Sequence, residues 1–330
     1  MSMIGRHLLG INGLTREQVE YLLTTAEQFV EVSTRNVKKV PTLRGKTVIN
    51  LFLEASTRTR SSFEIAGKRM SADVVNVSGS SSSTTKGETL IDTALTLESM
   101  DPDVVVIRHA SSGAAHLIAK HLTRASVINA GDGLHEHPSQ ALLDALTMRQ
   151  AFGTIEGLTV TIVGDVLRSR VARSNIHLLR LFGCSVRVVA PPTLAKKAEF
   201  EALGCQVFYH MPEALEGADV VMSLRMKHEY LKDLFVPNLD EYSRKYIVSE
   251  PMLARYAPNC KVLAPGPIIR GTEITSEVAD GPRSLISRQV TNGVAVRMAL
   301  LYVLGARRSD AARERDEEIE PLGLEAEASS

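Results

Sequence analysis

Eleven consecutive residues, EASTRTRSSFE at 54–64, constrain this chain more than any other stretch. They follow 47–53, an apolar run that predicts a buried strand, and they lead into 63–70, whose pattern predicts a helix. The stretch is therefore expected to form a strand-to-helix turn. At such a turn the first backbone N–H groups of the helix have no partner and the helix dipole favours an anion.

The side chains at this turn suit a phosphate group. Ser56, Thr57 and Thr59 supply hydroxyl donors, and Arg58 and Arg60 carry guanidinium groups whose fork fits phosphate or carboxylate. The alternative is an ordinary helix N-cap followed by two solvated arginines. Five consecutive residues of this kind, directly after a buried strand, favour a phosphate-recognising turn.

Strand patterns alternate with helical patterns along the rest of the chain. The predicted strands are 47–53, 73–77, 103–107, 126–130, 158–165, 185–190, 205–209 and 219–224. Strands separated by helices at this spacing predict parallel sheets with right-handed crossovers. A second alternation begins at 158, so the expected fold class is α/β, with two doubly wound parallel-sheet domains and the active site in the cleft between them.

The length of 330 residues fits two domains of ordinary size. We expect a first domain at 1–145 and a second at 146–287. An apolar helix at about 288–306 is expected to pack back onto the first domain, and the charged stretch 307–330 to be a disordered tail.

Composition argues against several classes of function. The net charge is zero and Trp is absent, so neither a basic field nor base stacking indicates a nucleic-acid partner. No apolar run approaches about 18 residues, so no membrane span is expected. Three scattered cysteines without metal-ligand spacing, and an N-terminus without an apolar signal region, predict free thiols in a cytoplasmic protein.

Cations and amides recur at the carboxyl ends of the predicted strands, which form the ligand edge of an open parallel sheet. The expected set is Arg58, Lys86, Arg108, His137 and Gln140 from the first half, with Arg170, Arg225 and Lys227 from the second. Together they predict an interdomain cleft for two anionic ligands. Arg168, Arg170 and Arg173 share one turn, and two of these three are expected on a solvated helix face.

The cleft holds no acidic pair, Ser/His/Asp order or phosphate-binding P-loop. His135 and His137 are two residues apart rather than the four of a helical zinc site, so no metal is expected. A site of cations and hydrogen-bond donors predicts transfer of an activated group carried on phosphate. Positioning and charge stabilisation would drive the transfer, without a cofactor.

These motifs occur in the order seen in the transcarbamoylase family, which the chain resembles up to about Gly305. The matching segments are 54–60, the serine-rich loop with 86–89, 137–140, 164–170, 224–225 and 265–267. Together they look most like catalytic chains of the aspartate branch. The resemblance implies that the first domain binds carbamoyl phosphate and the second binds L-aspartate. The products would be N-carbamoyl-L-aspartate and phosphate, in pyrimidine (UMP) biosynthesis.

The resemblance also implies a role for each site residue. The carbamoyl phosphate ligands would be Ser56, Thr57, Arg58, Thr59, Arg108, His137, Gln140, Gly266 and Pro267, with a cis bond between the last two. Of these, Arg58, Thr59, Arg108 and His137 would be catalytic, because they would stabilise the developing oxyanion. The aspartate ligands would be Ser82, Lys86, Arg170, Arg225 and Lys227. Ser82 and Lys86 would come from a neighbouring subunit of a homotrimer, which a regulatory chain or a dihydroorotase could join.

Two positions depart from the family pattern. Lys227 stands where a glutamine is usual, and Ala264 replaces the histidine common before Pro265. Two alternatives to aspartate transfer stay open: transfer to another amino acid such as ornithine, and a non-catalytic anion-binding homologue. The positive charges of Arg225 and Lys227 favour aspartate, because they would repel the ammonium group of ornithine.

Overall fold

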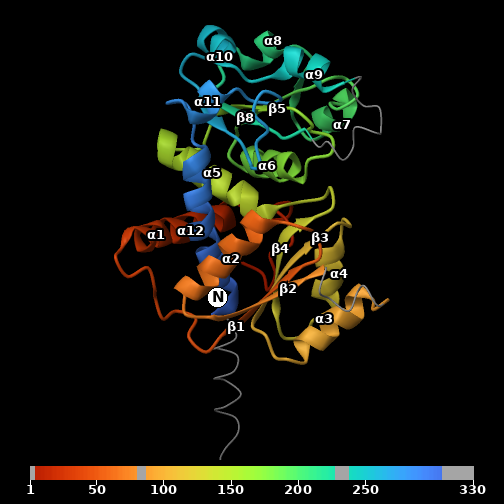
Figure 1. The fold of residues 1–330 in the computed structure, drawn as a ribbon, viewed down its shortest axis with the longest axis vertical. Coiled ribbons are helices and arrows are strands. Elements are labelled where there is room, and N and C mark those ends of the chain that lie inside the picture. The colour runs from red at the N-terminus through yellow and green to blue at the C-terminus, as the bar shows by residue number, and fades with distance from the viewer. Residues whose placement is uncertain (1–3, 80–86, 227–237, 307–330) are drawn as a thin grey trace, which may run out of the picture.

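The computed structural model describes residues 4–79, 87–226 and 238–306. It contains two parallel sheets, each flanked by helices (Figure 1). The α/β class and the pair of doubly wound sheets predicted from the sequence are confirmed. None of the described helices is long and apolar enough to cross a membrane.

The first sheet has the strand order β2-β1-β3-β4, and every pairing is parallel. Its strands are β1 (Thr47–Phe52), β2 (Asp73–Ser78), β3 (Val104–His109) and β4 (Ser126–Asp132). Its helices are α1 (Arg16–Thr34), α2 (Thr57–Arg69), α3 (Leu90–Glu98), α4 (Ala114–His121) and α5 (Pro138–Phe152). The strand order reverses between β1 and β3, so their carboxyl ends flank the crevice where open sheets bind ligands.

The second sheet has the order β7-β6-β5-β8-β9 and is also parallel throughout. Its strands are β5 (Thr159–Val163), β6 (Ser185–Val189), β7 (Gln206–Phe208), β8 (Val220–Ser223) and β9 (Lys261–Leu263). The helices that follow β5 are α6 (Arg170–Leu181), α7 (Lys197–Ala202), α8 (Met211–Leu215), α9 (Leu239–Tyr246), α10 (Glu250–Tyr256), α11 (Ser276–Asp280) and α12 (Ile286–Gly305). The strand order reverses between β5 and β8, which carry Arg170 and Arg225 beyond their carboxyl ends.

The last helix, α12, follows the second sheet in the chain but packs against α1, α2 and α5 of the first (Figure 1). Its apolar side chains fill the space between these helices. Leu301 is fully buried, and a Cβ placed on Gly67 of α2 would lie 3.8 Å from Leu301 Cδ1. The long α12 therefore ties the end of the described chain to the first sheet.

We expect Leu301→Ala to lower the free energy of unfolding by about 2–5 kcal/mol, because it removes buried methyl groups and leaves a cavity at the α12–α2 contact. Val290→Ala is the matched control, because Val290 lies on the same helix with 62% of its surface exposed. That change should stay within about 0.5 kcal/mol. Urea unfolding of both variants checks the prediction, and equal losses would contradict this packing of α12.

Three short helices, α9, α10 and α11, were not predicted. Each buries only one or two large side chains, such as Tyr242 in α9 and Leu253 in α10. The apolar residues Leu239, Tyr242 and Tyr246 of α9 do follow helical spacing, but all three segments are short and otherwise charged and polar, so their periodic pattern is weak. Tertiary contacts, rather than a periodic pattern, fix these segments as helices.

Candidate active site

The predicted phosphate turn joins β1 to α2. Ser56 is the N-cap of α2 and makes no side-chain capping bond, so its hydroxyl is not committed to the helix. Thr57 and Arg58 are exposed in the first helical turn, whereas Thr59 is buried. A Cβ placed on Gly266 would lie 3.1 Å from Arg58 Nε, so the Arg58 side chain lies directly against that glycine. The turn from one sheet thus meets the loop that follows β9 of the other.

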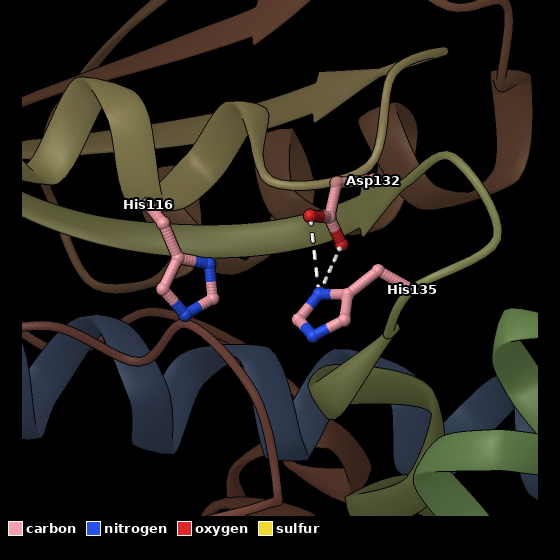
Figure 2. A group of neighbouring side chains, drawn as sticks. All are labelled: His116, Asp132 and His135. Atoms are coloured by element: carbon pink, nitrogen blue, oxygen red, sulfur yellow. Dashed lines mark hydrogen bonds and ion pairs between the residues drawn. The ribbon is translucent and has the colours of Figure 1, made fainter.

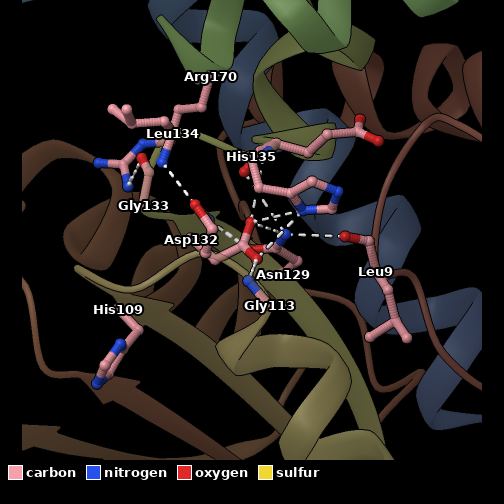
Figure 3. A network of polar contacts seen from close by, with 12 residues as sticks. Leu9, His109, Gly113, Asn129, Asp132, Gly133, Leu134, His135 and Arg170 are labelled. Atoms are coloured by element: carbon pink, nitrogen blue, oxygen red, sulfur yellow. Dashed lines mark hydrogen bonds and ion pairs between the residues drawn. The ribbon is translucent and has the colours of Figure 1, made fainter. Parts of the chain in front are cut away.

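Two arginines from the two sheets share one carboxylate. Arg108 Nη2 donates to Glu54 Oε1 at 3.0 Å, while Arg170 donates to Oε2 from Nη1 at 2.8 Å and to Oε1 from Nη2 at 2.5 Å. Arg170 also donates to the Gly133 carbonyl at 3.1 Å (Figure 3), and Arg108 to the Ala130 carbonyl at 3.2 Å. The carboxyl ends of β1, β3 and β4 and the start of α6 therefore converge on Glu54.

The charges at this convergence are mutually compensated. Burial raises the pKa of Glu54, but hydrogen bonds and charges from Arg170 and Arg108 outweigh it and hold that pKa below its usual range. Burial, together with the charge of Arg170, lowers the pKa of Arg108 to about 10, so it stays a cation at neutral pH. An anionic substrate that binds either arginine must share or replace its contact with Glu54.

Gly131 allows the two arginines to approach each other. Its φ of +118° lies in the region that only glycine adopts readily. A Cβ at this position would lie 3.0 Å from Arg108 Nη1 and 3.1 Å from Arg170 Nε. Any larger residue would therefore push both guanidinium groups away from the end of β4.

His137 is the N-cap of α5 and is 4% exposed. Its backbone N–H donates to Ser174 Oγ at 2.8 Å, which joins α5 to α6. Burial lowers the pKa of His137 well below its usual value, and the charges of Arg108, Arg170 and Arg297 lower it further. The imidazole is therefore neutral. Within the described part of the chain its buried Nδ1 has no hydrogen-bond partner.

Gln140 lies one helical turn beyond His137, and its Nε2 donates to Asp144 Oδ1 at 2.8 Å. The loop after β9 carries a cis Gly266–Pro267 bond, as the resemblance implied. This loop is held at its start, because the Ala264 N–H donates to Gln289 Oε1 of α12 at 3.0 Å.

Arg225 follows β8 on the facing side of the cleft. Burial lowers the pKa of Arg58, and the charge of Arg225 lowers it further. The two guanidinium groups are therefore close enough to repel each other. The charge of Arg225 also reaches Glu273, which is 2% exposed; burial raises the pKa of this carboxyl to about 7. Glu273 Oε1 accepts from the Ile269 N–H.

Three predicted aspartate ligands, Ser82, Lys86 and Lys227, lie outside the described residues. The prediction that two of the arginines at 168–173 are solvated is wrong for Arg168. It is 6% exposed, and its Nε and Nη2 contact Asp165 Oδ2 at 2.9 and 2.8 Å. A buried carboxylate three residues earlier compensates the charge, so this arginine is structural.

Two buried or bridging carboxylates were missed from the sequence. Glu54 opens the phosphate motif, where a carboxylate among cations predicts no contact with an anion. Its place directly after a buried strand, beside predicted cations of both halves, is the signal that could have indicated an ion pair. Asp144 lies four residues after Gln140 on the same helix, and that spacing was the available sign of their contact.

His116, Asp132 and His135 are neighbours whose potential ligand atoms all lie within 4.8 Å of one another (Figure 2). Asp132 Oδ1 accepts from Asn129 Nδ2 at 2.8 Å and Oδ2 from the Gly113 N–H at 2.7 Å, and His135 Nδ1 lies 3.2 Å from both oxygens (Figure 3). Both oxygens of Asp132 already accept hydrogen bonds, so this side chain is better suited to fixing the loop than to binding a metal.

The fold and the site define an α/β protein of two parallel sheets in which arginines from both sheets lie close together. A family model described as "Aspartate/ornithine carbamoyltransferase, carbamoyl-P binding domain" matches residues 6–150. A second, described as "Aspartate/ornithine carbamoyltransferase, Asp/Orn binding domain", matches residues 156–304. The chain belongs to the aspartate/ornithine carbamoyltransferase family.

Curated relatives support the aspartate branch. The chain is 57% identical over 305 residues to the aspartate carbamoyltransferase catalytic subunit of Sorangium cellulosum, covering 92% of this chain and 94% of the relative. It is 54% identical over 315 residues to that of Syntrophotalea carbinolica, covering 95% and 100%.

Solved structures of both branches share the fold. The aspartate transcarbamoylase of Trypanosoma cruzi, in complex with carbamoyl phosphate and aspartate, matches with a TM-score of 0.81 at 29% identity, covering 92% of this chain and 97% of that one. The same enzyme with N-(phosphonacetyl)-L-aspartic acid gives 0.80 at 29%, covering 92% and 96%. The ornithine carbamoyltransferase of Pyrococcus furiosus gives 0.81 at 27%, covering 92% and 98%. Backbone similarity alone therefore does not choose the acceptor.

Proposed function

We propose that this chain is an aspartate carbamoyltransferase, which transfers the carbamoyl group of carbamoyl phosphate to the amine of L-aspartate in pyrimidine (UMP) biosynthesis. The observation that carries the proposal is the convergence of Arg58 and Arg108 from one sheet with Arg170 and Arg225 from the other. Relatives at 53–57% identity, all named aspartate carbamoyltransferase catalytic subunits, support the same acceptor.

The donor binds at the first sheet in this proposal. Its phosphate takes hydrogen bonds from the Ser56–Thr59 turn, where the uncapped start of α2 and the charge of Arg58 favour an anion. Arg108 and His137 contact the carbamoyl oxygen and Gln140 the amino group. The Gly266–Pro267 loop, which Arg58 already touches, closes over the carbamoyl end.

The acceptor binds between the sheets. Arg170 holds the α-carboxylate of aspartate and Arg225 the side-chain carboxylate, with Ser82, Lys86 and Lys227 as further ligands. A dicarboxylate matches two separate cations, whereas the ammonium group of ornithine would meet a positive charge. This electrostatic difference supports aspartate within a family that uses both amino acids.

The reaction needs no protein base in this arrangement. The neutral amine of aspartate attacks the carbamoyl carbon, and the carbonyl oxygen becomes an oxyanion. Arg58, Thr59, Arg108 and the neutral His137 stabilise that charge through hydrogen bonds. The bond from carbon to the phosphate oxygen then breaks, and the leaving phosphate takes up the amine proton. Rate acceleration comes from positioning and charge stabilisation.

The test is an assay of carbamoyl transfer with aspartate and with ornithine as separate acceptors. We expect turnover with carbamoyl phosphate and aspartate, and none above background with ornithine. Activity with ornithine alone would overturn the choice of acceptor. Tight phosphate binding without turnover of either amino acid would instead support a non-catalytic homologue.

A homotrimer with shared sites is part of the proposal. β2 is an edge strand of the first sheet, with Val75 49% exposed, and Ile65 of α2 is 42% exposed. These apolar groups support a subunit contact next to the chain that leads to Ser82 and Lys86. Native mass measurement should give three chains, or a multiple of three with a regulatory chain or dihydroorotase. A monomer as active as the assembly would contradict shared sites.

A cytoplasmic location completes the proposal. Cys184, Cys205 and Cys260 are free and buried, which suits a reducing compartment. Burial raises the pKa of each thiol to about 11, so none is a reactive thiolate at neutral pH.

A further inference from the structure

Three side-chain amides converge on Asp144, which is fully buried. Gln140 Nε2 donates to its Oδ1 at 2.8 Å and Gln289 Nε2 to the same oxygen at 2.7 Å. Asn175 Nδ2 donates to Oδ2 at 2.9 Å. The donors come from α5, α12 and α6, so the carboxylate joins helices associated with both sheets.

The direction of these hydrogen bonds has a chemical consequence. An ionised carboxylate only accepts hydrogen bonds, so each amide must turn its NH₂ end toward Asp144 and its carbonyl end away. Gln289 shows the result, because its Oε1 accepts from the Ala264 N–H at the start of the loop that carries Gly266. Gln140 is oriented in the same way, because its NH₂ group donates to Asp144 and its carbonyl end points away. It lies one helical turn from His137.

We propose that Asp144 is a positioning residue that turns the carbonyl oxygen of Gln140 toward the carbamoyl amino group and, through Gln289, holds the loop at Ala264. This inference rests on the proposed function, because it assigns Gln140 to the donor. It deepens that function by explaining how the site distinguishes an NH₂ group from a methyl group. Only the NH₂ group can donate to the carbonyl that Asp144 orients.

Keeping an ionised carboxylate here is costly to the fold, which supports a functional reason for it. Burial raises the pKa of Asp144 to about 6, against hydrogen bonds from Gln289, Asn175 and Gln140 and the charge of Arg297 on α12. The unfolded chain ionises near its ordinary value of 3.8, so stability is lost as pH rises from about 4 to about 6.

Acetyl phosphate is the probe for this role, because it has the shape of carbamoyl phosphate with a methyl group in place of the NH₂ group. In Asp144→Leu, no acceptor remains for the three amide donors, so Gln140 loses its fixed direction. We expect kcat/KM with carbamoyl phosphate to fall about 10²-fold. The preference for carbamoyl over acetyl phosphate should fall by about tenfold, the equivalent of one lost hydrogen bond. Inhibition by inorganic phosphate should not change.

Asp103→Leu is the matched control. Asp103 is also a buried carboxylate, with Oδ2 accepting from the Thr47 N–H at 2.9 Å, but it precedes β3 at the edge opposite the ligands. This variant should lose stability and keep the donor preference. A merely structural Asp144 would behave in the same way, so an unchanged preference in folded Asp144→Leu overturns the inference.

The pH dependence of the wild-type preference gives a test that needs no variant. A protonated Asp144 carboxyl no longer needs three hydrogen-bond donors. Over the same pH range His137 stays neutral, and Arg297 stays charged because its pKa is about 10. The preference for carbamoyl phosphate should therefore weaken as pH falls through about 6. A preference that is constant from pH 5 to 8 overturns the inference, whereas a wild type without aspartate carbamoylation would overturn the proposed function instead.

Discussion

Arg58→Ala should lower kcat/KM for carbamoyl transfer by roughly 10³-fold or more while the protein stays folded. The guanidinium group lies at the phosphate turn and directly against Gly266, so its removal takes away charge at both the leaving phosphate and the developing oxyanion. The Arg58 side chain is exposed, so no core packing is lost. Steady-state rates and a thermal melt of the same preparation measure both halves of the prediction.

The control for this variant is Arg60→Ala, two residues along the same helix. It removes an equal charge from α2, but the proposed site does not use Arg60. We expect its kcat/KM to stay within about threefold of the wild type. Equal losses in the two variants would show that general positive charge at α2, rather than a specific contact of Arg58, supports the reaction.

Arg225→Ala should act mainly on the acceptor, with the second largest effect. We expect kcat/KM for aspartate to fall by roughly 10²- to 10³-fold, because a charged hydrogen bond to the side-chain carboxylate is lost. The KM for carbamoyl phosphate should change little, since the charged ligands proposed for the donor, Arg58 and Arg108, belong to the first sheet. Initial rates over a matrix of both substrates separate the two effects.

Arg180→Ala is the matched control for the second sheet. Arg180 lies on α6 and donates to the Gly204 carbonyl at 3.1 Å, away from the cleft. Its loss should leave both substrate constants unchanged. If Arg225→Ala instead raised the KM for carbamoyl phosphate as strongly as that for aspartate, the assignment of Arg225 to the acceptor would be wrong.

The sequence was sufficient to predict the α/β class and the places of Arg58, Arg108 and Arg225 after buried strands, because both depend on local patterns. Apolar runs predicted β1 and β3, and the polar residues that follow them fell at the ligand edge by the geometry of parallel sheets. Arg108 is the clearest case: the end of an apolar run placed it at the carboxyl end of β3, and the structure gives it a bridging carboxylate there.

The contacts between distant segments could not be predicted. Glu54 and Arg170 are 116 residues apart, and their pairing depends on how the two sheets face each other. Asp144 meets Gln289 across 145 residues for the same reason, since α12 returns to the first sheet. The burial of Arg168 escaped prediction because a solvated arginine and one neutralised by Asp165 have the same local sequence pattern.

The central claim, that one cleft binds a phosphorylated donor and a dicarboxylate acceptor together, is tested most directly by titration calorimetry with N-(phosphonacetyl)-L-aspartic acid. This compound joins a phosphonate to an aspartate. We predict one molecule bound per chain, at least about 10²-fold more tightly than phosphate or aspartate alone, because both groups bind in one event. Arg58→Ala and Arg225→Ala should each remove most of that gain. Binding no tighter than that of phosphate, or unaffected by Arg225→Ala, would contradict the account.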